Sequence, residues 1–88
     1  MEEKYGAIWI TIEEDASATI VSEKYLPEIE KVHCIFRQAS GFYVPHSYVK
    51  KRDPQYSLPI WTRENDKALM PTIDAANDYL RSYAQRNT

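Results

Sequence analysis

Residues 27–41 have the sequence PEIEKVHCIFRQASG, for which two secondary structures compete. A helix would begin with Pro27 in its first turn and end with Gly41 as a left-handed cap, and both residue types favour these positions. Its apolar residues would then share one face: Ile29, Val32, Ile35, Phe36 and Ala39. A strand is the alternative, because VHCIF is rich in β-forming residues and residues 39–41 suit a three-residue hairpin loop. We favour the helix.

The segment before these residues predicts two strands. Residues 7–12, AIWITI, alternate between an isoleucine side and a side that carries Trp9, which is the period of a strand. A polar turn at residues 13–17 separates this strand from a second one at residues 18–22. We expect the two strands to form a hairpin whose isoleucine side points toward the core.

The segment after Gly41 predicts two more strands. Residues 42–49 place four side chains on one side of a strand: Phe42, Val44, His46 and Tyr48. Pro45 cannot donate a hydrogen bond to a neighbouring strand, so it predicts an edge strand or a bulge. A loop at residues 50–55 leads to another strand at residues 56–62, which a proline also interrupts.

The last expected element is a helix over residues 66–86. Its apolar residues recur at helical spacing: Leu69, Ile73, Ala76, Leu80 and Tyr83. Asp66 suits the N-terminal cap, whereas Pro71 is either tolerated in the first turn or marks the true start.

The expected order of elements, ββαββα, implies an α+β fold. It corresponds to a two-layer sandwich in which an antiparallel sheet carries helices on one face. If residues 27–41 form a strand instead, the alternative is a five-stranded sheet with one C-terminal helix. A chain of 88 residues supports a modest core and no second domain, so we expect residues 1–88 to form a single domain.

The composition bounds the class of protein. A hydrophobic content of 43%, with 27% charged residues and two glycines, describes a compact globular protein and not a disordered one. The single Cys34 excludes an internal disulfide and fits a reducing compartment. The first residues predict neither a signal peptide nor a membrane span. We therefore expect a soluble, cytoplasmic protein with no membrane partner.

Few side chains suggest catalysis. Cys34 and His46 would face each other only if residues 31–38 were a strand, and such a pair would suggest a thiolate with its base. His33 and Cys34 are sequence neighbours and no further cysteine exists, so they do not predict a metal site. Two glycines cannot build a glycine-rich phosphate loop. The sequence thus predicts no enzyme, no metal and no cofactor.

The aromatic residues are more informative. If the isoleucine side of the sheet faces the helices, Trp9, Tyr43 and Trp61 lie on the opposite, open face, and such a patch usually marks a partner site. The alternative is that the sheet curls enough for the tryptophans to complete a small core. The candidate partner-binding residues combine this face with its basic rim: Trp9, Tyr43, Tyr48, Lys50, Lys51, Arg52, Tyr56, Trp61 and Arg63.

These residues predict a non-enzymatic protein-binding domain, an inhibitor or adaptor. It would dock through the aromatic sheet face or through the edge strand that carries Pro45, on an unidentified protein or on a second copy of the chain. The alternative is a single-stranded nucleic-acid-binding module in which aromatic rings stack on bases and the basic residues follow phosphates. The net charge of −2 disfavours this alternative, because dedicated nucleic-acid domains are usually basic.

Overall fold

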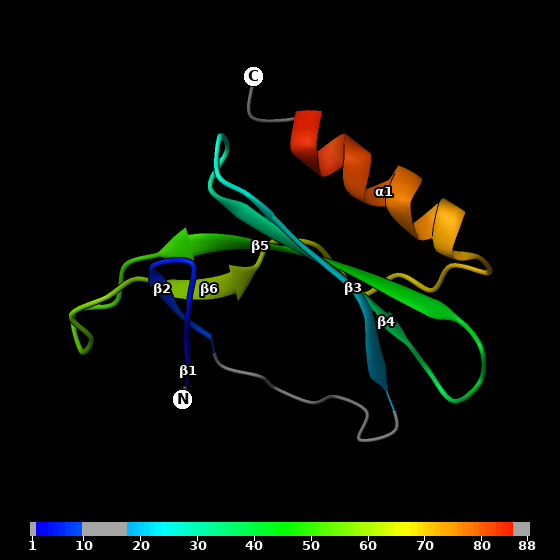
Figure 1. Ribbon diagram of the computed structural model, residues 1–88, viewed down its shortest axis with the longest axis horizontal. Coiled ribbons are helices and arrows are strands. Elements are labelled where there is room, and N and C mark those ends of the chain that lie inside the picture. The colour runs from blue at the N-terminus through cyan, green and yellow to red at the C-terminus, as the bar shows by residue number, and fades with distance from the viewer. Residues whose placement is uncertain (1, 10–17, 86–88) are drawn as a thin grey trace.

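The computed structural model describes residues 2–9 and 18–85, which form one curled sheet and a C-terminal helix (Figure 1). The elements are β1 (Glu2–Lys4), β2 (Ala7–Trp9), β3 (Thr19–Leu26), β4 (Lys31–Arg37), β5 (Tyr43–Lys51), β6 (Ile60–Arg63) and α1 (Ile73–Gln85). The strand order in the sheet is β1-β2-β6-β5-β4-β3, and only the β2–β6 pair is parallel. The chain therefore has an α+β fold. The expected ββαββα order is wrong, because the segment expected as the first helix is a strand.

Strand β4 is the element that differs most from the prediction. Residues 31–35 are all buried, which a helix with one apolar face would not allow. Cys34 is among them, although it would have lain opposite the apolar face of the expected helix. Gly41 is left-handed, with a φ of 93°, and closes a three-residue loop in which Gln38 and Phe42 are bonded through their backbones. The strand alternative, including its hairpin loop, is confirmed. One helix rather than two accompanies a sheet with six described strands, one more than that alternative expected.

The N-terminal strands pair differently from the expected hairpin. Tyr5 and Gly6 both have positive φ, 53° and 78°, and form the two-residue turn between β1 and β2. Ile8 of β2 pairs with Ile60 of β6, whereas β3 pairs with β4, so the predicted hairpin between residues 7–12 and 18–22 is wrong. Residues 10–17, with the predicted polar turn, lie outside the described residues. Trp9 is buried and Ile8 only partly so, which reverses the expected inward side of β2.

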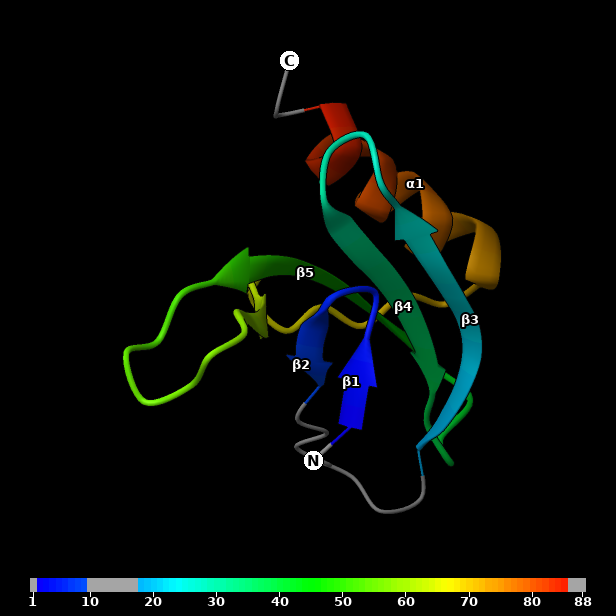
Figure 2. The ribbon, with the colours of Figure 1, turned by 60° about the vertical axis from the view of Figure 1, so that its left-hand side comes forward.

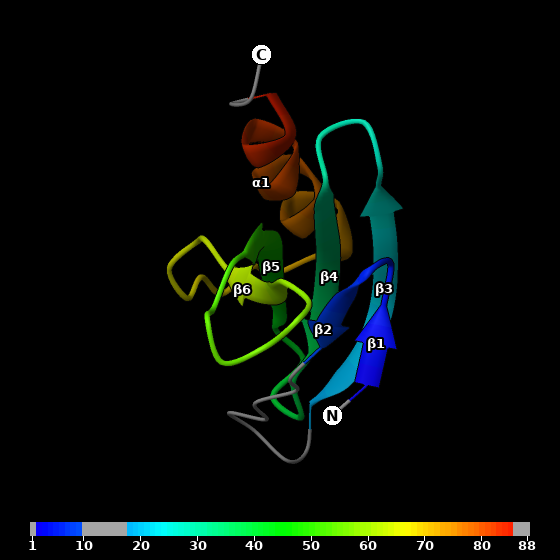
Figure 3. The same cartoon turned by 90° about the vertical axis from the view of Figure 1, so that its left-hand side faces the viewer.

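The sheet curls until its two outer strands, β1 and β3, lie near each other (Figures 2 and 3). Tyr5 stacks on Tyr25 of β3 with ring centroids 4.4 Å apart, and Lys4 Nζ lies 3.0 Å from the Glu23 carboxylate. Because β1 and β3 are not paired in the sheet, these side chains join the two edges. The inner face of the sheet is thereby enclosed.

Two hydrophobic cores lie on opposite faces of this curled sheet. The inner core is inside the curl: Ala7, Trp9, Val32, Cys34 and Trp61. The outer core lies beneath the helix: Ile35, Ala76 and Leu80. Successive side chains of a strand point to opposite faces, which is why Cys34 and Ile35 enter different cores. With Trp9 and Trp61 only 5% and 4% exposed, the predicted open aromatic face is wrong, and the curled-sheet alternative is confirmed.

Helix α1 begins later than predicted. Thr72 caps it, because its hydroxyl accepts a hydrogen bond from the Ala75 backbone N–H at 3.1 Å, so Asp66 is not the cap. Leu69, expected in the helix, precedes it and is 51% exposed. The helix packs on β5 and β4, toward one side of the sheet. No helix in the described ranges has the length and apolar character needed to cross a membrane.

Pro45 lies in a central strand and not at an edge, since β5 runs between β4 and β6. Pairing with β6 ends at Tyr48, and beyond that point the side chain of Asn65 replaces a neighbouring strand. Its Oδ1 accepts from the Ser47 N–H at 2.8 Å, and its Nδ2 donates to the Pro45 carbonyl at 2.9 Å. Proline is tolerated there because β6 does not extend alongside it.

Candidate binding groove

A groove of about 610 Å³ lies between α1 and the outer strand β3. Its floor carries Ser22, Lys24 and Leu26 of β3 with His33 of β4. The three β3 residues are alternate positions of one strand and therefore share a face, and Lys24 is paired with His33 across the ladder. The groove exists because the helix covers β4 and β5 and leaves this face of β3 open.

One face of α1 forms the wall of the groove. The residues follow helical spacing: Asp74, Asn77, Asp78, Arg81 and Ala84. Ile35 packs near Ala76 while Lys31 reaches the carbonyl of Tyr83, so α1 runs in the same direction as β3. The groove therefore changes character along its length, from an acidic first end, through a middle that carries Lys24 and the Asp78–Arg81 ion pair, to an apolar far end.

Three levels can be distinguished along this groove from the strand register. Ser22, which is paired with Ile35, lies at the level of Asp74 and Asn77. Lys24 lies at the level of Asp78 and Arg81, which form an ion pair of 3.0 Å with each other. Leu26, which is paired with Lys31, lies at the level of Ala84.

His33 is an unusual component of the groove floor. The residue is 7% exposed, and its Nε2 has no hydrogen-bond partner within the described structure. Burial lowers the pKa of its imidazole, and the charges of Lys31 and Lys24 act in the same direction, so the ring is neutral near pH 7. Buried polar atoms are normally hydrogen-bonded, so this nitrogen is an unmet polar group beside the groove.

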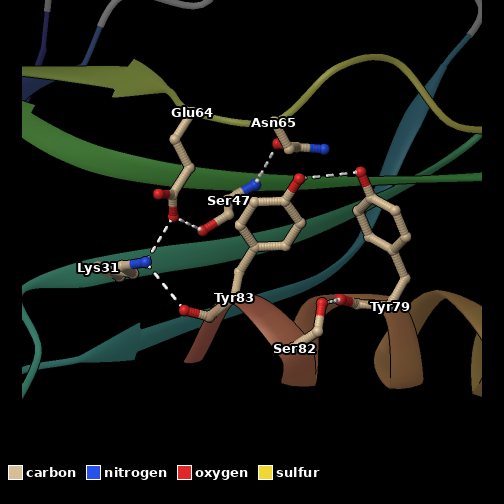
Figure 4. Close-up of polar contacts among 7 residues, drawn as sticks. All are labelled: Lys31, Ser47, Glu64, Asn65, Tyr79, Ser82 and Tyr83. Atoms are coloured by element: carbon tan, nitrogen blue, oxygen red, sulfur yellow. Dashed lines mark hydrogen bonds and ion pairs between the residues drawn. The ribbon is translucent and has the colours of Figure 1, made fainter. Parts of the chain in front are cut away.

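A buried polar network holds the helix against the strands behind the groove (Figure 4). The ammonium of Lys31 lies 2.7 Å from the Glu64 carboxylate and donates to the Tyr83 carbonyl at 2.9 Å. The Ser47 hydroxyl donates to the same Glu64 oxygen. The last turn of α1 is thus attached to β4, to β5 and to the residue after β6, which sets the position of the groove wall.

Sequence reasoning missed both the groove and this network. Lys31 stands beside an apolar run, and Glu64 and Asn65 follow a predicted strand, but no spacing connects these residues. The register of β3, β4 and β5 brings them together, and the register depends on the whole sheet. The helical spacing of residues 74, 77, 78 and 81 was the available signal, since it predicts one polar helix face.

The aromatic residues predicted to bind a partner are mostly part of the cores. Tyr48 packs on Trp9 with ring centroids 4.7 Å apart, and Trp61 donates its indole N–H to the Lys4 carbonyl at 2.8 Å. Tyr43 packs against the outer core beneath the helix. Tyr56 is partly buried in the connection between β5 and β6. The two tryptophans are therefore not available for stacking on the bases of a nucleic acid.

The predicted basic residues remain nearer the surface. Lys51 and Arg52 are exposed. Lys50 lies over the Trp61 ring, 5.4 Å from its centroid, and 3.6 Å from the Glu30 carboxylate. Arg63 lies 3.4 Å from a ring nitrogen of His46. The structure thus brings Lys50 to Trp61, but the ring is buried, so the basic residues do not border an exposed ring from either tryptophan.

Cys34 and His46 are directly paired across β4 and β5, yet they are not a catalytic pair. The ring nitrogens of His46 contact the Tyr48 hydroxyl at 2.9 Å and the Arg63 guanidinium. Cys34 is fully buried, and burial raises the pKa of its thiol to about 12, with the Glu23 charge acting in the same direction. A nucleophilic cysteine needs a lowered pKa, so this thiol has the opposite character.

We expect Cys34 to react with a thiol reagent at pH 8 at least about a hundredfold more slowly in the folded protein than in urea. The inner core excludes the reagent, and the raised pKa leaves little thiolate. The release of thionitrobenzoate, followed by absorbance, measures both rates. Similar rates in the two states would show that the inner core is open.

No three His, Cys, Asp or Glu side chains in residues 2–9 and 18–85 lie close enough together to hold a metal ion. The groove therefore offers hydrogen bonds, charges and an apolar end rather than metal ligands. No protein-family model, curated protein or solved structure matches this chain.

Proposed function

We propose that the chain is a non-enzymatic protein-binding domain that takes an extended segment of a partner as an additional strand along β3. The observation that carries the proposal is the position of β3: an eight-residue strand at the edge of the sheet, with the groove open beside it. Strand addition supplies affinity through backbone hydrogen bonds, while pockets for alternate side chains supply specificity. An inhibitor or an adaptor needs no more than this.

The outward backbone groups of β3 follow from the hydrogen bonds of the other strands. The N–H groups of Tyr43 and Ser47 bond to Met70 and Asn65, away from β4. Backbone groups alternate in direction along a strand. Ser47 is paired with His33, so the backbone groups of His33 point away from β5 and toward β3. Lys24, which is paired with His33, therefore points its own N–H and C=O groups toward β4. Glu23 and Tyr25 accordingly point their N–H and C=O groups away from β4, where a partner strand would pair. Side-chain contacts with Lys4 and Tyr5, and no backbone pairing, link this edge to β1, so a bound strand would displace those side chains.

Two exposed apolar side chains extend this surface along the same strand. Ile20 and Val21 are 42% and 41% exposed, and the ladder with β4 shifts by one residue between Ile20 and Ser22. A bulge of this kind increases the local twist and ends regular pairing. Strand addition is therefore expected from Ser22 to Leu26. One end of a bound segment could pack on the exposed Ile20 and Val21 side chains.

A random ten-residue peptide library selected on the folded domain should yield binders that protect the Glu23 and Tyr25 amides from hydrogen exchange by at least about tenfold. These two amides point outward, whereas the Lys24 amide is already bonded to β4 and should change little. Exchange followed by two-dimensional NMR resolves the three amides. If no peptide binds, or if bound peptides leave Glu23 and Tyr25 unprotected, the proposal is wrong.

A matched pair of variants separates strand addition from ordinary side-chain contact. Glu23→Pro and Glu23→Ala both remove the carboxylate that contacts Lys4 and Tyr5. Only the proline removes an outward N–H, and an edge strand tolerates proline on its solvent side. Peptide binding should be retained in Glu23→Ala and lost in Glu23→Pro, provided that circular dichroism shows both variants folded. Equal binding by the two variants would contradict pairing at this edge.

A further inference from the structure

We infer that the groove selects its partner strand by charge order: an acidic residue opposite Lys24, with an apolar residue opposite Leu26 and a basic or amide residue opposite Ser22. This inference rests on the proposed function, because only a strand paired with β3 presents alternate side chains to these three positions. The inference specifies which kinds of side chain the bound segment carries at these three positions.

The preference for an acidic residue comes from the middle of the groove. Lys24 is exposed on the floor and has no ion-pair partner among the described residues, whereas Arg81 on the wall is already paired with Asp78 at 3.0 Å. A carboxylate placed directly opposite Lys24 on a neighbouring strand forms a stabilising cross-strand pair, whereas a second cation there is unfavourable. His33 adds an unpaired ring nitrogen beside this position, and its neutral form adds no repelling charge. The middle position therefore favours an acid.

The two flanking preferences come from the ends of the groove. At the level of Ser22 the wall presents Asp74, which has no ion-pair partner among the described residues, and the amide of Asn77. A lysine, arginine or amide side chain complements these groups. At the other end Leu26 and Ala84 offer carbon atoms, which favour an apolar side chain.

A second copy of the chain does not satisfy this order. If β3 of a second molecule paired with β3, it would place the side chains of its own groove-facing side in the groove: Thr19, Ser22, Lys24 and Leu26. That row contains a cation and no acid, so the middle position would face either an uncharged residue or a second Lys24. A pair of β3 strands from two copies is therefore disfavoured, and we assign the occupant as a segment of a different protein.

The order of the three residues depends on strand direction. An antiparallel segment has the pattern apolar, x, acidic, x, basic, and a parallel segment has the reverse pattern. Nine-residue fluorescent peptides of both orders, with Leu, Glu and Lys at the three positions and threonine elsewhere, test both directions. Each has a charge-swapped counterpart in which Glu and Lys exchange places, so that composition and net charge are identical.

By fluorescence anisotropy, one of the two orders should bind at least about tenfold more tightly than its charge-swapped counterpart. In the variant Lys24→Glu the preference should reverse, because the middle position then favours the lysine of the swapped peptide. Lys51→Glu makes the same charge change on the exposed β5–β6 connection, away from the groove, and should leave the preference unchanged.

The outcomes separate the inference from the proposed function. Equal binding of parent and swapped peptides, with Glu23 and Tyr25 amides protected, would overturn the charge order and leave strand addition intact. A preference that Lys24→Glu does not alter would overturn it as well. If neither peptide nor any library peptide protects the two amides, both the inference and the proposed function fail.

Discussion

Replacing Glu64 by glutamine is expected to lower the free energy of unfolding by about 3 kcal/mol, the low end of the range for breaking a buried ion pair, because Lys31 is buried whereas Glu64 is partly exposed. Lys31 is 1% exposed, and the neutral amide of glutamine can accept a hydrogen bond from its ammonium, as the Tyr83 carbonyl does, but cannot balance its buried charge. Glutamine has the shape of glutamate, so the loss reports the charge and not a cavity. Urea unfolding followed by circular dichroism measures it.

Replacing the other partner of the ion pair, Lys31, should lower the free energy of unfolding by less. In Lys31→Met the Glu64 carboxylate remains 23% exposed and keeps the Ser47 hydroxyl, so we expect a loss of about 1 to 2 kcal/mol. The double variant Lys31→Met with Glu64→Gln should recover much of the loss caused by Glu64→Gln alone, because no buried charge is left unpaired. A Lys31→Met variant that is less stable than Glu64→Gln would contradict the assignment of Lys31 as the more deeply desolvated partner.

Replacing Asn65 by alanine is expected to lower the free energy of unfolding by about 3 kcal/mol. The substitution leaves the Ser47 N–H and the Pro45 carbonyl without the partners that Asn65 supplies, and each buried group left unpaired costs about 1 to 3 kcal/mol. Asn77→Ala is the matched control, because Asn77 is exposed on α1 and its loss should change stability by less than about 0.5 kcal/mol. Urea unfolding at pH 7 compares the two.

The variant Asn65→Asp refines this prediction through its pH dependence. A carboxylate retains the acceptor for the Ser47 N–H but directs a second oxygen at the Pro45 carbonyl, which raises the pKa of the new acid. The variant should therefore become more stable, relative to the parent protein, as the pH falls through that raised pKa, because the protonated acid can donate. If the loss of unfolding free energy in Asn65→Asp, relative to the parent protein, is constant between pH 7 and pH 4, Asn65 does not replace a neighbouring strand.

Several local features were predictable because neighbouring residues decide them. The left-handed glycine at the end of residues 39–41 is a turn signal in any context, and the alternation of residues 42–49 is the period of a strand. The helical face formed by Ala76 and Leu80 was likewise visible, since both are buried against the sheet. The start of the helix was not, because by residue type Asp66 is at least as good a cap as Thr72, which is the cap in the structure.

The two competing structures for residues 27–41 could not be separated locally. Val32, Ile35 and Phe36 form an apolar row at helical spacing and also belong to a β-rich run. Burial decides between them: Lys31, His33 and Cys34 are buried as well, because both faces of β4 are covered. A strand covered on both faces loses the alternation that identifies a strand in a sequence.

The candidate site was predicted only in part. Lys51 and Arg52, at the end of β5 and just after it, are exposed as expected, but the two tryptophans expected to bind a partner lie inside the curl. The groove residues Lys24 and Arg81 were not singled out, because nothing in their separate segments relates them. Their proximity is created by the register of β3 on β4 and by the packing of α1 on β4.

By itself the sequence determined the turn that ends at Gly41, the alternation of residues 42–49 and the polar and apolar faces of the C-terminal helix, since these depend on backbone sterics and on periodicity within one segment. Only the tertiary structure decided that residues 31–37 are a strand, that the tryptophans are buried and that β3 is an edge. The physical reason is that an apolar row becomes interior or exterior only when a second layer covers it. An edge likewise exists only once every other strand has found its neighbour, as β2 does in pairing with β6.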